Sequence, residues 1–203
     1  MAWQDRDYYR DHDSGRMSPL MWLVAGSMPL FTAFGIRVKA HASLIVLIVV
    51  ILLFGFGSGT SFESRIQSAT ILFGIILLHE FGHCFAARWM GGTAEEIMMT
   101  PLGGLAFAMA PRKPWPTFVT VAGGPAVNVI LCLVCGVGLY FTLGVFPLGP
   151  WTFGKIYHDI NSTGWLNLAS YFFWIYATSY ALLLFNMIPV WPLDGGQILQ
   201  SIL

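Results

Sequence analysis

Residues 77–89 read LLHEFGHCFAARW and place one glutamate and two histidines in a stretch that is apolar on its N-terminal side. The stretch lies within an apolar segment, 69–90, that is long enough to cross about 30 Å of hydrocarbon. A charged side chain near the centre of a bilayer costs about 2.5–3.5 kcal/mol. Three ionisable groups so close together therefore indicate a functional site.

The spacing of these groups is that of a metal site. His79 and His83 are separated by four residues, so on a helix both imidazoles project from one face and can share a metal ion. Glu80 lies beside them, where it can act as a general base towards a water molecule at the metal. This HExxH arrangement is typical of zinc hydrolases. Because the motif also arises by chance, its position matters: His79 lies ~15 Å along the predicted helix from each end of the segment.

Composition indicates a polytopic membrane protein. Of 203 residues, 56% are hydrophobic and 10% are charged, whereas soluble domains carry about 25% charged residues. The formal net charge is zero, and no basic face indicates a nucleic-acid partner. The three cysteines lie in apolar stretches and give no disulfide framework.

The predicted fold is an all-α membrane protein with polytopic transmembrane helices and a small β-hairpin or strand element at the cytoplasmic side. We expect about four clear spans, at 42–57, 69–90, 117–145 and 166–188, and a fifth helix begun at the C-terminus. Residues 1–17 are predicted to form a disordered polar tail. Residues 18–41 are expected to be an interfacial segment ending in a short strand, 95–109 a β-hairpin or re-entrant loop, and 149–165 a loop.

The basic residues predict the orientation. Most of them fall on one side of this arrangement, and the positive-inside rule assigns that side, with the N-terminus and the 91–116 hairpin, to the cytoplasm. The residues on this side are Arg6, Arg10, Arg16, Arg37, Lys39, Arg88, Arg112 and Lys113, against Arg65 and Lys155 on the other.

Two histidines leave a catalytic zinc site incomplete, because such sites usually have three protein ligands. Asp194, in WPLDGGQIL, is the one remaining acid in an apolar setting and is the candidate third ligand. The alternative is that Asp194 caps the helix that follows it, and one carboxylate can do both. Gly195 and Gly196 would let the backbone approach closely.

With these motifs the sequence resembles the site-2 protease family of intramembrane zinc metalloproteases. The resemblance rests on HEFGH at 79–83 and NMIPVWPLDGG at 186–196, supported by PLGGLA at 101–106 and GGPAVN at 123–128, in the family's order. It implies a three-helix catalytic core with one Zn²⁺ per chain on His79, His83 and Asp194, and Glu80 as base. It also implies a metalloprotease domain over 18–203 that is C-terminally incomplete relative to the family.

The resemblance further implies a multi-pass location in a bacterial cell membrane and regulated cleavage of a membrane protein within its transmembrane helix. Asn128 would be a polar partner for the substrate backbone or the oxyanion, with a hydrogen bond between helices as the alternative. We expect Asn186 to make a structural hydrogen bond. The 94–109 hairpin would present an edge strand to which an unwound substrate segment adds.

Two other functions are the alternatives to a protease. A membrane metal transporter or sensor would need the three ligands but not Glu80 beside them, and would need a polar path to both faces of the membrane. A catalytically silent scaffold would need neither intact ligands nor an intact base. The protease hypothesis accounts for all four residues.

Overall fold

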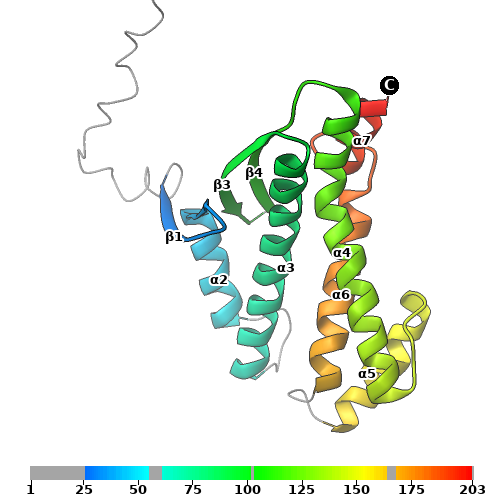
Figure 1. The fold of residues 1–203 in the computed structure, drawn as a ribbon. Helices are drawn as coiled ribbons and strands as arrows, with labels where there is room; N and C mark the ends of the chain where they lie inside the picture. Colours follow the sequence, from blue (N-terminus) through cyan, green and yellow to red (C-terminus); the bar gives the residue numbers. More distant parts are fainter. Residues whose placement is uncertain (1–25, 55–60, 102, 164–167, 203) are drawn as a thin grey trace, which may run out of the picture.

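A computed structural model describes residues 26–54, 61–101, 103–163 and 168–202; the tail predicted at 1–17 lies outside these residues. The described chain is mostly helical, with one small sheet, as predicted (Figure 1). The helices are α2 (Ala42–Phe54), α3 (Phe62–Trp89), α4 (Pro114–Leu143), α5 (Pro150–Thr163), α6 (Leu168–Asn186) and α7 (Asp194–Ile202). The strands are β1 (Ser27–Ala33), β2 (Ile36–His41), β3 (Thr93–Thr100) and β4 (Gly103–Met109).

Three helices, α3, α4 and α6, are long and apolar enough to cross a membrane. They correspond to three of the four predicted spans. The remaining span was predicted at 42–57, where α2 has 13 residues and is ~20 Å long, short of the hydrocarbon thickness; the rest of that range lies outside the described residues. The α3, α4 and α6 helices run alongside one another, and α2 lies on the outer side of α3 (Figure 1).

The α3 helix begins earlier than predicted. It starts at Phe62, where the Ser61 hydroxyl accepts a hydrogen bond from the amide of Ser64, so part of the polar loop expected before residue 69 is helical. His79 consequently lies ~15 Å from the Trp89 end of the helix and ~25 Å from the Phe62 end. The HExxH residues are thus nearer to the end of α3 that leads into the sheet.

The sheet has the order β1-β2-β3-β4, with two antiparallel hairpins joined by a parallel β2–β3 pair. The predicted strand at β2 is confirmed: Ile36, Val38 and Ala40 are buried and alternate with more exposed residues. The hairpin expected near 95–109 is also confirmed as β3 and β4. The prediction for 18–41 missed β1, because Pro29 reads as a strand breaker; a register shift at Pro29 accommodates it.

The loop predicted at 149–165 is wrong, because Pro150–Thr163 forms the helix α5. Pro150 stands at the start of this helix, where proline is well tolerated. Ile156 and Ile160, one helical turn apart, are buried and pack with residues of α4 and α6. This amphipathic helix lies at the end of the bundle opposite the sheet (Figure 1).

Candidate metal centre

The two histidines lie where α3 approaches α4 closely. A Cβ on Gly82 would lie 2.4 Å from the carbonyl oxygen of Gly123, so glycine is needed for this contact. The next residue on α4, Gly124, faces the imidazoles: a Cβ there would lie 2.3 Å from Nε2 of His83 and 2.6 Å from Nε2 of His79. The GGPAVN segment therefore provides both a helix contact and open space at the two nitrogens.

Asp194 reaches the same space from the first turn of α7. The chain between α6 and α7 folds back on itself, and Gly195 and Gly196 pack directly on its backbone. A Cβ on Gly195 would lie 2.4 Å from the carbonyl oxygen of Met187, and one on Gly196 would lie 2.6 Å from the amide nitrogen of Trp191. The close approach expected of this glycine pair is confirmed, and it directs the start of α7 towards α3.

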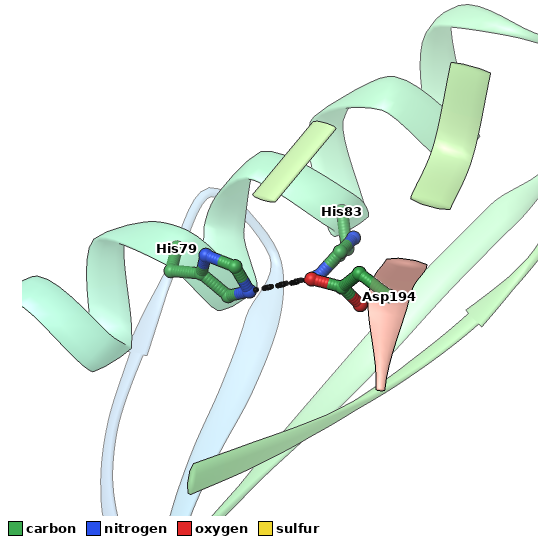
Figure 2. A group of neighbouring side chains, drawn as sticks. All are labelled: His79, His83 and Asp194. Carbon is green, nitrogen blue, oxygen red and sulfur yellow. Dashed lines mark hydrogen bonds and ion pairs between the residues drawn. The ribbon is translucent and has the colours of Figure 1, made fainter. Parts of the chain in front are cut away.

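The three side chains point at one another (Figure 2). Nε2 of His79 lies 3.2 Å from Nε2 of His83 and 3.1 Å from Oδ2 of Asp194. Nε2 of His83 lies 3.5 Å from Oδ1 of Asp194. The Asp194 carboxylate is thus turned towards the imidazoles, and all three residues form one group that could hold a metal ion.

The donor set fits a tetrahedral divalent cation. Bonds of about 2.0–2.1 Å from zinc to nitrogen and oxygen ligands give ligand–ligand separations of about 3.3 Å in a tetrahedron. The two Nε2 atoms are 3.2 Å apart, and the distances to the Asp194 carboxylate, 3.1 Å from His79 to Oδ2 and 3.5 Å from His83 to Oδ1, also lie near this value. Oδ2 of Asp194 is buried, and its 3.1 Å contact with Nε2 of His79 is an ion pair that does not have the geometry of a hydrogen bond. A cation between the three groups would satisfy that oxygen.

Each imidazole is oriented through its second nitrogen. Nδ1 of His83 lies 3.0 Å from the carbonyl oxygen of Thr120 and 3.4 Å from the backbone amide nitrogen of Gly124. In the tautomer with its proton on Nδ1, the ring donates to the nearer Thr120 carbonyl and keeps the Nε2 lone pair for a metal. Nδ1 of His79 lies 3.1 Å from Nδ2 of the Asn128 side chain. The Oδ1 atom of the same side chain is buried without a partner among the described residues. A half-turn of that amide would let Oδ1 accept from Nδ1–H and satisfy both groups.

Glu80 lies beside the metal ligands and contacts the sheet. Its side chain is buried, and Oε2 accepts a hydrogen bond from the backbone amide of Ala106 in β4, at 3.1 Å. Gly104, also in β4, packs against the same side chain: a Cβ there would lie 2.1 Å from Cγ of Glu80. The PLGGLA segment therefore brings its backbone onto the carboxylate, a contact the sequence did not predict.

Asn186 also lies closer to the centre than predicted. Its Nδ2 is 3.4 Å from Nε2 of His79, on the side of the imidazole that faces Asp194. Asn128, by contrast, is fully buried against Nδ1 of the same ring. A polar amide at the end of an apolar helix, just before the PVWPLDGG segment, was the signal for Asn186. The two asparagines therefore contact opposite nitrogens of one histidine.

Comparisons with known proteins match the part of the chain that contains these residues. The pattern of peptidase family M50 matches residues 67–153 and 148–203. Zinc metalloprotease MJ0392 of Methanocaldococcus jannaschii is 30% identical over 180 residues, covering 87% of this chain and 45% of that protein. Putative zinc metalloprotease sll0528 of Synechocystis is 34% identical over 145 residues, covering 71% of this chain and 33% of that protein. The chain therefore spans less than half the length of these relatives.

Among solved structures, the fold is similar to that of the site-2 protease from Methanocaldococcus jannaschii. The TM-score is 0.61 at 27% sequence identity, and the match covers 87% of this chain and 71% of that one. The similarity thus extends over most of this chain.

Proposed function

The chain belongs to peptidase family M50, and from this premise we propose that it is an intramembrane zinc metalloprotease. It would hydrolyse a peptide bond in or near a transmembrane segment of a membrane-protein substrate, with one Zn²⁺ held by His79, His83 and Asp194. The observation that carries the proposal is the convergence of these three donors, 3.1–3.5 Å apart, beside Glu80. Both histidines belong to a helix apolar and long enough to cross a membrane.

The chemistry follows from the residues around the centre. Bound there, zinc would polarise the scissile carbonyl and lower the pKa of a water molecule. Glu80 would take a proton from that water as it attacks the carbonyl, and would then deliver the proton to the leaving amine. Because Glu80 is adjacent to a ligand and is not one of the three donors, its carboxylate stays available for this transfer.

We assign the two asparagines different roles. Asn128 is fully buried, and its side-chain amide contacts Nδ1 of His79. This supports a role in orienting that ligand instead of the substrate contact predicted from the sequence. Asn186 directs its Nδ2 to the other side of the ring, 3.4 Å from Nε2. A donor there is well placed to stabilise the negative charge that develops on the carbonyl oxygen.

Substrate would approach along β4. A helical segment hides its carbonyls in internal hydrogen bonds, so it must unwind before water can attack. An unwound segment can add as a strand to the free edge of β4, whose outward-facing side chains Leu105, Phe107 and Met109 are 53–71% exposed. The contact between β4 and Glu80 would bring such a segment beside the general base.

The membrane orientation remains the one predicted. The apolar helices support a membrane protein, and we propose that the sheet and the start of α4 face the cytoplasm. The described basic residues at this end are Arg37, Lys39, Arg88, Arg112 and Lys113, whereas Arg65 and Lys155 lie in elements at the opposite end. Location in a bacterial cell membrane stays a prediction.

The test is cleavage of a reporter transmembrane segment by the purified chain in detergent, with zinc measured in the same preparation. The protease hypothesis predicts zinc-dependent cleavage that Glu80→Gln abolishes. A transporter or sensor using the same ligands predicts metal flux in liposomes without cleavage, unchanged by Glu80→Gln. Zinc-free protein without either activity would favour the scaffold.

A further inference from the structure

The free edge of β4 is the starting point. In the part of the chain that the structure describes, β4 pairs with β3 alone, since it stands last in the sheet. In the antiparallel ladder between β3 and β4, Ala106 lies opposite Ile97. Opposite pairs in such a ladder alternate between hydrogen-bonded and non-hydrogen-bonded ones, and the amide of Ala106 donates to Glu80 instead of to β3, as in a non-hydrogen-bonded pair. The amide N–H of Ala106 therefore points away from β3, towards the free edge.

The backbone amide of Ala106 is already hydrogen-bonded to Glu80. Oε2 of Glu80 accepts its hydrogen bond at 3.1 Å, so a side chain from α3 takes the position that the carbonyl of an added strand would use. Gly104, two residues earlier on the same face of β4, has no side chain to hold Glu80 away. The carboxylate is thus buried against the edge to which, on the proposed function, substrate adds.

We propose that the Glu80–Ala106 hydrogen bond acts as a latch: it holds the general base against β4 until the addition of a substrate strand breaks it. Resting on the proposed function, the inference is that a backbone carbonyl of the incoming strand replaces Oε2 of Glu80 on the Ala106 amide. One acceptor is exchanged for another, so no buried donor is left without a partner. The displaced carboxylate is then free to turn towards the space between His79, His83 and Asp194.

The latch couples two events that would otherwise be independent. While the edge is empty, the general base is held by the sheet and its Oε2 is engaged. Once a strand is in place, the base is released beside the bond to be cleaved. Because a single N–H cannot serve both acceptors at full strength, Glu80 and the substrate backbone compete for the Ala106 amide.

Competition predicts how Glu80 affects binding in the absence of any reaction. The probe is a short fluorescent peptide of alternating valine and threonine, titrated against the full chain in detergent micelles. Glu80→Ala removes the competing acceptor and should tighten binding about fivefold, as expected for release of one hydrogen bond. Glu80→Gln keeps a weaker, neutral acceptor and should fall between wild type and Glu80→Ala. The same peptide with two central prolines, which cannot add as a strand, should not bind.

Proline variants of β4 locate the effect at one amide. Ala106→Pro deletes the N–H, and proline is tolerated where the amide faces a free edge. In this background Glu80→Ala should no longer tighten binding. Ala108→Pro is the matched control, because it removes the next outward-facing amide and leaves that of Ala106 in place; there the gain from Glu80→Ala should persist. Zinc content and circular dichroism of each variant check the fold.

The outcomes separate the latch from the proposed function. Equal or weaker peptide binding by Glu80→Ala overturns the latch, and zinc-dependent cleavage by wild type would leave the protease standing. A gain that survives Ala106→Pro also overturns the latch, because the competition would then lie elsewhere. Absence of peptide binding in every variant overturns strand addition and the latch together.

Discussion

Oδ2 of Asp194 lies 3.1 Å from Nε2 of His79, although the two residues belong to different helices that are far apart in the sequence. They meet because the chain after α6 folds back and the glycine pair after Asp194 packs on that turn. Neither HExxH nor the aspartate is a complete metal site by itself. The centre exists only when α7 is docked against α3 and α4.

Removing Asp194 should therefore remove the metal. We expect Asp194→Ala to lose both zinc and cleavage, because two imidazoles alone leave a tetrahedral site short of a ligand. Metal analysis after dialysis measures the change. Asp159→Ala, at a half-buried position on α5 at the other end of the bundle, is the control and should keep one zinc per chain. Full zinc occupancy in Asp194→Ala would refute the assigned ligand set.

Glu80 should be separable from metal binding. Glu80→Gln keeps the size of the side chain and an acceptor for the Ala106 amide, but it cannot take a proton. We expect zinc content to be unchanged and cleavage to fall by about 10²–10⁴-fold. Glu95→Gln, an exposed position on β3, should leave cleavage unchanged. Wild-type rates in Glu80→Gln would rule out Glu80 as the base.

The two asparagines should act on different quantities. Asn128→Ala removes the partner of His79 Nδ1 and should weaken zinc affinity about 10–100-fold, whereas Asn128→Asp keeps an acceptor and should retain most of it. Competition with a zinc chelator measures both. Asn186→Ala should leave zinc affinity near that of wild type and lower kcat. If Asn128→Ala binds zinc as tightly as wild type, its contact with His79 does not orient the ligand.

The sequence predicted the parts of this site that depend on residue type and spacing. His79 and His83 follow from helical periodicity, and Asp194 stands out as an acid in an apolar setting. The structure adds contacts made by backbone atoms, such as the Thr120 carbonyl on His83 and the Ala106 amide on Glu80. Every residue has such atoms, so no pattern of side chains indicates which will be used.

The fold was predicted correctly where the local sequence pattern determines the element, and incorrectly where tertiary packing determines it. Long apolar runs identified α3, α4 and α6, and alternation identified β2. The helix α5 was missed because its buried face, formed by Ile156 and Ile160, depends on neighbours from α4 and α6. Tertiary packing, which the local sequence does not contain, selected the helix.

Space at the two histidines should be as important as the ligands. A Cβ on Gly124 would lie 2.3 Å from Nε2 of His83, so Gly124→Ala should reduce zinc occupancy and cleavage together without changing any ligand. Gly74→Ala is the matched control on α3: a Cβ there meets nothing within 4 Å. It should keep full zinc and gain up to about 1 kcal/mol in stability from helix propensity. Metal analysis beside thermal unfolding distinguishes the two variants, and normal zinc in Gly124→Ala would contradict the crowding argument.

Gly104 tests the contact between the sheet and the base. An alanine Cβ at this position would lie 2.1 Å from Cγ of Glu80, so either β4 or the carboxylate must move. We expect Gly104→Ala to lower kcat at least tenfold while zinc content stays at the wild-type level, because the added Cβ meets Glu80 and none of the three ligands. Alanine is no worse than glycine inside a strand, so loss of the sheet does not explain such a result. Leu105→Ala, on the outer face of the same strand, should instead raise KM with little change in kcat, since it removes apolar contact with the substrate. Unchanged kcat in Gly104→Ala would mean that proton transfer by Glu80 does not need the space beside Gly104.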